Sequence, residues 1–249
     1  MDRQEPDRRQ ADRELDARTL TQLSTRLLRA VRTDSDTEAD RWERIATIDE
    51  RVLSTLGTNP DAGKTFWINI YNAATQRALE DDPTQFGDRR RFFTRPLVTV
   101  AGRQLSLDTI EHGLLRGSQS KYGFGYVHSS FPSSFERRHR LEHVDARLHF
   151  ALNCGAASCP PIVAYDIEAI DDQLEMATAS YLENEVTYGS TAHAVTVPRV
   201  LLWYRGDFGG KRGIYRLLDR HELIPPATRP RLRYGSYEWA LQRGHYADR

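Results

Sequence analysis

The sequence predicts an α/β (α+β) fold: one domain with a small, mainly antiparallel sheet flanked by helices. Several long stretches carry apolar residues at three- and four-residue spacing, which is typical of helices that bury one face. Residues 193–204 alternate as a strand does, and residues 96–106 fit a hairpin with a two-residue turn. The 249 residues contain no repeat and no domain-sized linker, which favours a single domain.

The N-terminal part predicts an arm followed by helices. Residues 1–16 are almost all charged or polar, so we expect a flexible arm or a solvated helical extension before a domain at 17–249. Helices are expected at 19–31, 37–56 and 64–80. The composition of residues 57–63 predicts a loop. The third helix ends before Pro83, because the residue before a proline avoids helical angles.

The rest of the chain alternates expected strands and helices. Ala101-Gly102 is the expected hairpin turn, and Ser106 is the expected N-cap of a helix at 107–116. Residues 117–143 lack periodicity and predict a long loop. A buried strand is expected at 147–153, and further helices at 167–185, 211–221 and 235–243.

The charge balance and the termini limit the function classes. The 35 basic and 35 acidic side chains give no net field that would attract nucleic acid or anionic lipid. No stretch reaches the roughly 18–20 apolar residues of a membrane span, and the first residues do not resemble a signal peptide. We therefore expect a cytoplasmic protein without nucleic-acid or membrane partners. The chain is arginine-rich, with only three lysines, which reflects either multidentate ion pairing or a GC-rich genome.

The stretch from His149 to Pro160 is the most informative part of the sequence. Cys154 and Cys159 flank four small residues just after the expected strand, where open α/β sheets usually collect ligands. Two thiols cannot supply a four-ligand zinc site. They fit three interpretations: a nucleophile, a redox or structural disulfide, or two buried and inert residues.

A nucleophilic thiolate needs a histidine and an orienting group. His112 or His149 could be the base, with Asn69, Asn72 or Asp108 as the orienter. On the expected strand His149 and Cys154 point to opposite faces, which favours His112. Asp108, His112 and Arg116 lie one helical turn apart, and this spacing fits either a catalytic histidine or an ordinary ion-pair ladder.

Two other polar features have two interpretations each. Asn69, Asn72 and Gln76 share one face of the expected helix at 64–80, as either a site wall or a satisfied core network. Asp207 lies among glycines, where it either caps the next helix or orients the catalytic base.

Five sequence blocks resemble the family named domain of unknown function 547, also found in plant ternary-complex-factor-like leucine-zipper proteins. The blocks are FWINIYNA (66–73), LSLDTIEHGLLR (105–116), RLHFALNCGAASCPP (147–161), WYRGDF (203–208) and YGSYEW (234–239). The resemblance spans about residues 45–243. Its signature positions map onto Asn69, Asn72, Glu111, His112, Arg116, His149, Cys154, Cys159 and Asp207. Such residues are typical of a site, and an analogy with papain-like or transglutaminase-like folds follows.

The leading hypothesis is a cysteine-dependent hydrolase or acyltransferase acting on an amide, isopeptide or thioester bond. Cys154 is the expected nucleophile, His112 the base, and Asn69 or Glu111 the orienter. Backbone amides from Gly155 to Ser158 would be the oxyanion donors. The alternative is a non-catalytic module that binds a peptide or small molecule in the same cleft. Neither hypothesis requires a metal or a cofactor.

Overall fold

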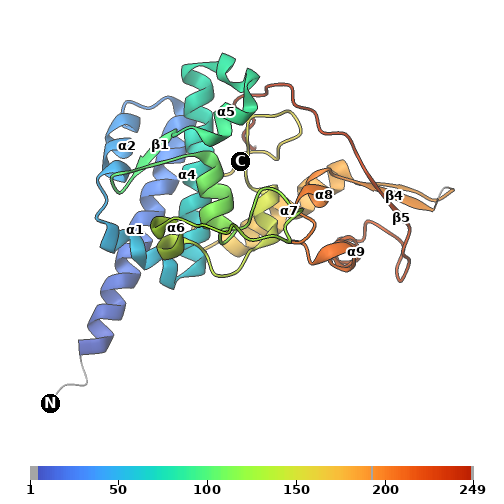
Figure 1. Ribbon diagram of the computed structural model, residues 1–249, viewed down its shortest axis with the longest axis horizontal. Coiled ribbons are helices and arrows are strands. Elements are labelled where there is room, and N and C mark those ends of the chain that lie inside the picture. The colour runs from blue at the N-terminus through green and yellow to red at the C-terminus, as the bar shows by residue number, and fades with distance from the viewer. Residues whose placement is uncertain (1–4, 192, 248–249) are drawn as a thin grey trace.

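Two long helices form the centre of the larger part of the molecule. The computed structural model describes residues 5–191 and 193–247. Helix α1 (Glu5–Thr33) lies along helix α4 (Pro60–Asp81), with Leu27 and Leu28 of α1 fully buried between them (Figure 1). Residues 5–16, expected as a flexible arm or a helical extension, belong to α1, whereas residues 1–4 lie outside the described part.

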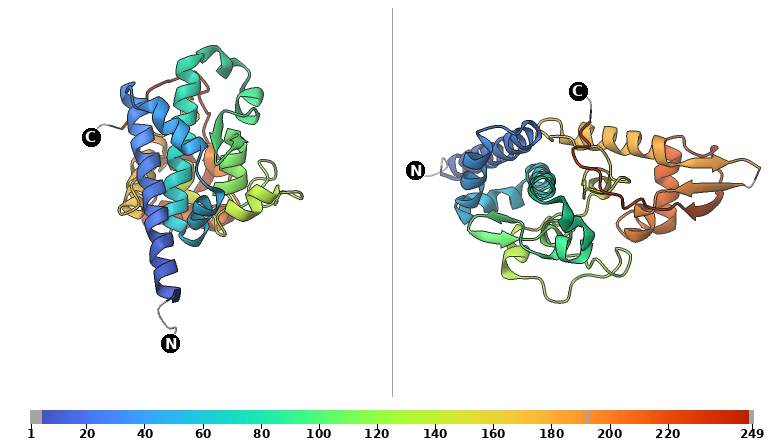
Figure 2. Two further views of the ribbon diagram at one scale, coloured as in Figure 1. Left: turned by 90° about the vertical axis from the view of Figure 1, so that its left-hand side faces the viewer. Right: turned by 90° about the horizontal axis from the view of Figure 1, so that it is seen from above.

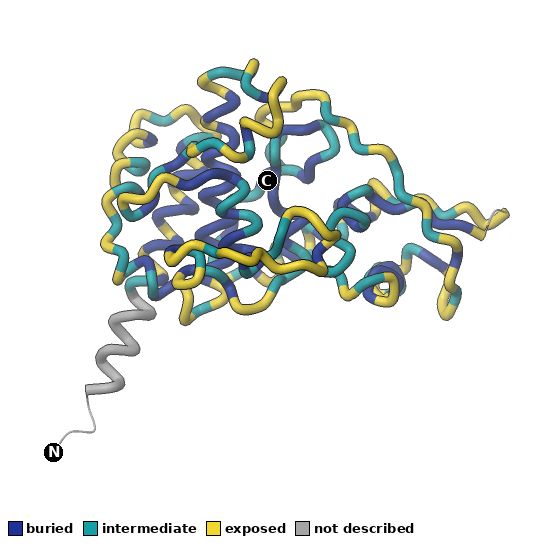
Figure 3. Tube along the Cα trace, viewed as in Figure 1, coloured by how far each residue is buried: buried dark blue, intermediate teal, exposed yellow. Residues whose placement is uncertain are grey.

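Helix α4 begins earlier than the sequence predicted, and its ends have clear causes. Asn59 caps it by accepting hydrogen bonds from two backbone amides, and Pro60 occupies the first turn, where its missing N–H costs nothing. The helix is buried on nearly all sides (Figure 3). It ends at Asp81, as Pro83 predicted, and is followed by η2 (Pro83–Gly87) and α5 (Arg89–Thr94).

The expected helix at 37–56 is divided into three pieces. These are α2 (Glu38–Ala46), α3 (Glu50–Leu53) and the 3₁₀ turn η1 (Ser54–Thr58). Asp49 starts the second piece by accepting the amide of Arg51. All three pieces contact α1.

The hairpin is confirmed. β1 (Val98–Val100) pairs antiparallel with β2 (Arg103–Leu105). Ala101 and Gly102 have φ angles of 48° and 70°, the mirror-image turn that matches the twist of two strands. The next helix, η3 (Thr109–Leu115), is a π-helix, and Ser106 Oγ accepts the amide of Thr109 at its start.

A second small sheet, with three strands, lies at the far end of the molecule. Helix α7 (Ile170–Glu185) leads to β3 (Thr187–Gly189), β4 (Ala194–Val197) and, after helices α8 (Val200–Trp203) and α9 (Gly210–Arg220), β5 (Arg231–Tyr234) (Figure 2). β4 pairs antiparallel with β3 and parallel with β5. The α+β class, with small sheets flanked by helices, is confirmed.

Three predicted elements are wrong in whole or in part. Of residues 193–204, expected to be strand-like, only β4 is a strand, and Val200–Trp203 forms α8. Residues 147–153 do not form a strand: the 3₁₀ helix η4 (Ala146–Phe150) begins at Asp145, whose carboxylate accepts the Arg147 amide. The run is buried, as predicted, but an apolar run of this length has no period that separates strand from helix. Residues 235–243 are irregular rather than helical, and the long loop at 117–143 contains α6 (Ser134–His139).

The last described segment, 235–247, runs from the small sheet back to the helical body (Figure 1). Gly244 N–H donates to Gln76 Oε1 on α4 at 3.0 Å, and Ile162 N–H donates to His245 O at 2.7 Å. Residues 235–247 thus connect the three-stranded sheet to the helical body. Within the described residues, no helix is both long and apolar enough to cross a bilayer.

Candidate functional site

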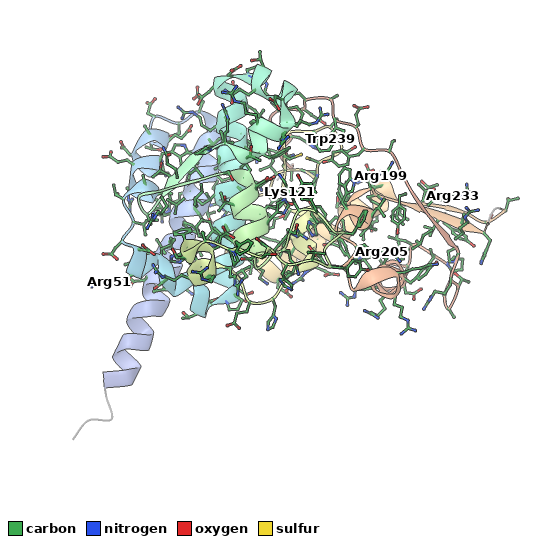
Figure 4. The ribbon with its side chains drawn as sticks, viewed as in Figure 1. Arg51, Lys121, Arg199, Arg205, Arg233 and Trp239 are labelled. Carbon is green, nitrogen blue, oxygen red and sulfur yellow. The ribbon has the colours of Figure 1, made fainter. Side chains whose placement is uncertain are left out.

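A pocket of about 640 Å³ lies where the two parts of the molecule meet. Its lining contains Cys154, Cys159, Glu111, His112 and His149, which are residues that the sequence singled out. Nine aromatic side chains also line it: Tyr71, Phe93, Tyr122, Phe124, Tyr181, Trp203, Tyr204, Tyr237 and Trp239. Trp239, from the returning segment, and Lys121, from the long loop, both lie near the centre of the molecule (Figure 4).

The two cysteine sulfurs are in contact. Both thiols are free, and Cys154 Sγ lies 3.1 Å from Cys159 Sγ. The Tyr237 hydroxyl lies 3.3 Å from Cys159 Sγ and 3.7 Å from Cys154 Sγ. The backbone N–H of Cys154 also donates to Cys159 Sγ, at 3.1 Å. Cys159 Sγ is therefore surrounded by donors.

Asparagine side chains hold the loop between the cysteines. Asn153 Oδ1 accepts the N–H of Gly155 at 2.9 Å, and its Nδ2 donates to Pro160 O at 2.8 Å, so one amide joins both ends of the loop. Asn72 of α4 fixes Asn153 in turn: its Oδ1 accepts the Asn153 N–H at 2.9 Å. Asn72 is fully buried and thus holds the cysteine loop against α4.

The returning segment holds the other side of the loop. Ala157 N–H donates to Ala240 O at 2.8 Å, and Gln242 N–H donates to Gly155 O at 2.8 Å. The Ser158 N–H donates to Glu238 O, while its hydroxyl accepts the Glu238 N–H. Three of the four backbone amides expected as oxyanion donors therefore already have an acceptor. The N–H groups of Gly155, Ala157 and Ser158 donate to Asn153 Oδ1, Ala240 O and Glu238 O.

The surroundings of the two thiols separate their pKa values. Burial opposes the Cys159 thiolate, but hydrogen bonds from the Cys154 thiol, the Tyr237 hydroxyl and backbone amides outweigh it and lower the Cys159 pKa. The hydrogen bond to Cys159, followed by burial, raises the pKa of Cys154. As pH rises, Cys159 therefore loses its proton before Cys154 does.

A buried carboxylate lies in the same pocket. Glu111 Oε1 accepts the Tyr204 hydroxyl at 2.6 Å, and Oε2 accepts the Tyr71 hydroxyl at 3.3 Å. Burial raises the pKa of Glu111, but His112, the Tyr204 hydrogen bond and nearby cations bring its net shift below the usual range. Glu111 is therefore a charged group in an aromatic wall.

His112 is held in one tautomer. Arg116, which can only donate, lies 2.9 Å from His112 Nδ1, so Nδ1 accepts and the ring proton of neutral His112 resides on Nε2. Burial, as the largest influence, lowers the pKa of His112 and keeps it neutral. Asp108 Oδ1 is 3.7 Å from Nε2. The Asp108–His112–Arg116 spacing therefore places these groups together on a π-helix rather than on an exposed ladder.

The buried Asp207 carboxylate pairs with Arg116 and His149 instead of capping a helix, so the helix-cap interpretation is wrong. Its carboxylate accepts two hydrogen bonds from Arg116, at 2.6 and 3.0 Å, and one from His149 Nε2 at 2.8 Å. Gly209 occupies the cap position of α9 instead. Tyr204 stacks on the His149 ring at 3.8 Å. Burial lowers the pKa of His149, although Asp207 opposes this.

The structure separates one predicted residue from this group. Asn69 pairs with the backbone of Tyr165, donating to its O at 2.9 Å and accepting its N–H at 2.9 Å, which makes it part of the α1–α4 core. Conversely, no sequence pattern indicated Tyr204 or Tyr237 as site residues. Their blocks appear in the family resemblance, but no periodicity placed their hydroxyls beside Glu111 and Cys159.

The chain matches the model of one protein family, described as "Protein of unknown function, DUF547", over residues 56–182. It belongs to the DUF547 family. The match covers about half of the 249 residues, from η1 to α7, and confirms the suspected resemblance over a shorter span than expected. No curated protein and no solved structure matches the chain.

The DUF547 span contains both cysteines, Glu111, His112 and His149. Tyr204, Asp207 and Tyr237 follow it in the chain, yet they complete the hydrogen bonds of the site. Among the described residues, no group of three or more His, Cys, Asp or Glu side chains is placed to hold a metal ion.

Proposed function

We propose that this DUF547 protein is a thiol-dependent hydrolase or acyltransferase whose nucleophile is Cys159. The observation that carries the proposal is that Cys159 Sγ accepts hydrogen bonds from the Tyr237 hydroxyl and the Cys154 backbone N–H, while Cys159 lines the same aromatic pocket as Glu111 and His112. A thiolate, not a thiol, is the reactive form. This moves the nucleophile from Cys154, the expected residue, to its neighbour in space.

The separated pKa values assign two roles. The Cys159 thiolate forms a C–S bond with a carbonyl carbon, and the leaving amine or thiol departs with a proton from the Cys154 thiol. The resulting thioester is then cleaved by water or by an acceptor. No histidine is hydrogen-bonded to either sulfur among the described contacts, so a preformed thiolate takes the place of the expected Cys–His pair.

Glu111 and His112 then bind the substrate rather than activate the thiol. Glu111 presents a carboxylate, and His112 carries its proton on Nε2, so together they offer an acceptor and a donor in one pocket. The rest of the lining contains nine aromatic residues, together with the charged Arg90, Asp108 and Lys121. This composition fits a peptide or small molecule with an apolar or aromatic part next to an acyl group.

The aromatic lining also favours the second candidate, a module that binds such a ligand without chemistry. The Tyr237 ring lies 4.6 Å from that of Trp239 and 5.0 Å from that of Trp203. The three rings contact one another at interplanar angles of 32° to 55° and form an apolar wall suited to ligand binding in its own right.

Acylation by a small reactive ester separates the two. We expect 4-nitrophenyl acetate to place one acetyl group on the intact protein, located at Cys159 by peptide mass spectrometry, and Cys159→Ser to abolish it. Asn184→Ala, at an exposed site on α7 outside the pocket, is the matched control and should be acetylated. Quenching of Trp203 and Trp239 fluorescence by an aromatic ester, without acetylation, would support the binding module instead.

A further inference from the structure

The cysteine pair has a second chemical capacity that acyl transfer does not use. We propose that Cys154 and Cys159 form a reversible disulfide by exchange with low-molecular-weight disulfides, so that the site is also a dithiol–disulfide redox centre. The proposal rests on the contact between the two sulfurs and on the loop that holds them. It is independent of the acyl-transfer proposal.

The sulfurs need only a small movement to bond. They lie 3.1 Å apart, and a disulfide bond measures about 2.05 Å. Two thiols packed as inert core residues would have apolar neighbours, but here a backbone N–H and the Tyr237 hydroxyl point at the sulfur of Cys159. Polar donors at one sulfur are typical of a reactive pair.

The loop keeps the two sulfurs together from several sides. The Asn153 side chain bridges Gly155 and Pro160, and the segment containing Ala240 and Gln242 hydrogen-bonds the loop between the cysteines. Gly155, with φ of 94°, provides the turn, and a Cβ there would lie 2.4 Å from Leu79 Cδ1. A loop held this way gives each thiol a high effective concentration toward the other, which favours the intramolecular disulfide.

The pocket gives access to both thiols, although to different extents. Cys154 is partly exposed, whereas Cys159 is 5% exposed, and both line the pocket. A disulfide reagent therefore reaches the pair from the pocket. Arg90 in the lining is exposed and would attract a reagent that carries carboxylates, whereas the charge of Lys121 is paired with Asp108.

The exchange balances in two steps. The Cys159 thiolate attacks one sulfur of R–S–S–R, forming a mixed disulfide and releasing RS⁻, which takes the proton of the Cys154 thiol. The new Cys154 thiolate attacks the Cys159 sulfur, forming the Cys154–Cys159 bond and releasing the second RS⁻. The dithiol is oxidised by two electrons and the small disulfide is reduced by two.

Equilibration with glutathione and glutathione disulfide at pH 7, followed by alkylation with N-ethylmaleimide and intact mass measurement, tests the proposal. We expect the two thiols to become unavailable together as the ratio is shifted, with a monomer on a non-reducing gel and full return with excess glutathione. Two alkylated thiols at every ratio would overturn the proposal, and so would disulfides formed only between chains.

Variants assign the steps. Cys154→Ser should retain glutathione on Cys159, because the resolving thiol is missing, whereas Cys159→Ser should gain it at least tenfold more slowly. Asn153→Ala should make the disulfide about tenfold easier to reduce, and Asn184→Ala, at an exposed site on α7, should leave it unchanged. Equal glutathione uptake in the two cysteine variants would contradict the assigned order of attack.

The two proposals fail in different ways. Acetylation of Cys159 in reduced protein without disulfide formation leaves the acyl-transfer proposal and removes the redox proposal. Disulfide formation without acetylation does the reverse.

Discussion

At the scale of single residues, Tyr237 determines how reactive the thiol pair is. Its hydroxyl lies 3.3 Å from Cys159 Sγ and is one of the donors that lower the Cys159 pKa. A hydrogen bond to a charged acceptor contributes about 1.5–3 kcal/mol. Removing this donor therefore acts directly on the population of the thiolate.

We expect Tyr237→Phe to raise the Cys159 pKa and to slow alkylation by iodoacetamide at pH 7 several-fold, with wild-type rates approached only at higher pH. Tyr122→Phe, in an exposed lining residue of the same pocket, is the matched control. The measurement is the labelling rate against pH in the Cys154→Ser background. If the two tyrosine variants had the same profile, Tyr237 would not be a donor to the thiolate.

Asp207 is the residue on which the buried charges depend. It and Arg116 are completely buried and joined by two hydrogen bonds. Burial works against the Asp207 carboxylate, but His149 and Arg116 lower its pKa overall. A carboxyl with a lowered pKa stabilises the fold at pH values above its unfolded pKa of about 3.9, and this contribution is lost as pH falls through the folded pKa.

We expect Asp207→Asn to lower the free energy of unfolding at pH 7 by about 3–5 kcal/mol, because Arg116 keeps a buried, uncompensated charge. The difference from wild type should shrink below about pH 4. Asp219→Asn, which breaks the half-exposed pair with Arg229, should cost no more than about 1 kcal/mol. Guanidinium unfolding at several pH values gives both numbers, and a pH-independent difference would contradict the linkage.

Residue types could be predicted better than their partners. The sequence indicated both cysteines, Glu111 and His112 as site residues, and all four line one pocket. It paired Cys154 with His112, because a strand at 147–153 would turn His149 away from Cys154. The 3₁₀ geometry removes that argument, and the partner of each thiol is instead the other thiol and Tyr237.

At the scale of elements, prediction succeeded where a local signal decides the structure. The Ala101-Gly102 turn and the helix stop before Pro83 depend on φ preferences that a few residues carry. η4 and β5 depend on tertiary contacts: β5 exists because it pairs with β4, which is more than thirty residues earlier in the chain. No local pattern in residues 231–234 predicts the pairing with β4.

The turn between α8 and α9 is packed so closely that it fixes the position of Asp207. Gly206 N–H donates to Phe124 O at 2.7 Å, and a Cβ on Gly206 would lie 2.2 Å from Gly125 O. Because the obstacle is backbone, a side chain there requires the 123–126 loop to move. That loop also lines the pocket, through Gly123 and Phe124.

We expect Gly206→Ala to lower the free energy of unfolding by about 1–3 kcal/mol. It should also speed amide hydrogen exchange in residues 123–126. Gly87→Ala, where a Cβ meets nothing within 4 Å, is the control and should change stability by less than about 1 kcal/mol. Equal effects of the two substitutions, measured by thermal unfolding, would show that the 123–126 loop moves away freely.

At the scale of the whole molecule, the segment 235–247 joins the small sheet to the helical body. It begins after β5, supplies Tyr237 and Trp239 to the pocket, hydrogen-bonds the cysteine loop, and ends against Ile162. The sequence predicted a helix at 235–243, which would have shortened this segment and kept it at the sheet. Its extended path comes from contacts with α4 and the cysteine loop, far away in sequence.

Within this segment, residues 244–247 bind the helical body and residues 238–242 bind the cysteine loop. Truncation can distinguish these two roles. A chain ending at Arg243 loses the contacts of Gly244 with Gln76 and of His245 with Ile162 but keeps the hydrogen bonds from Glu238, Ala240 and Gln242 to the cysteine loop. We expect it to be less stable but to retain rapid alkylation of Cys159 at pH 7.

A chain ending at Ser236 also loses the Tyr237 hydroxyl and the loop hydrogen bonds. We expect it to show faster amide exchange at residues 155–159 and iodoacetamide labelling at neutral pH no faster than that of a free thiol, measured on folded protein verified by circular dichroism. If the shorter chain kept the fast labelling of the longer one, the thiolate would depend on the 153–160 loop alone and not on the returning segment.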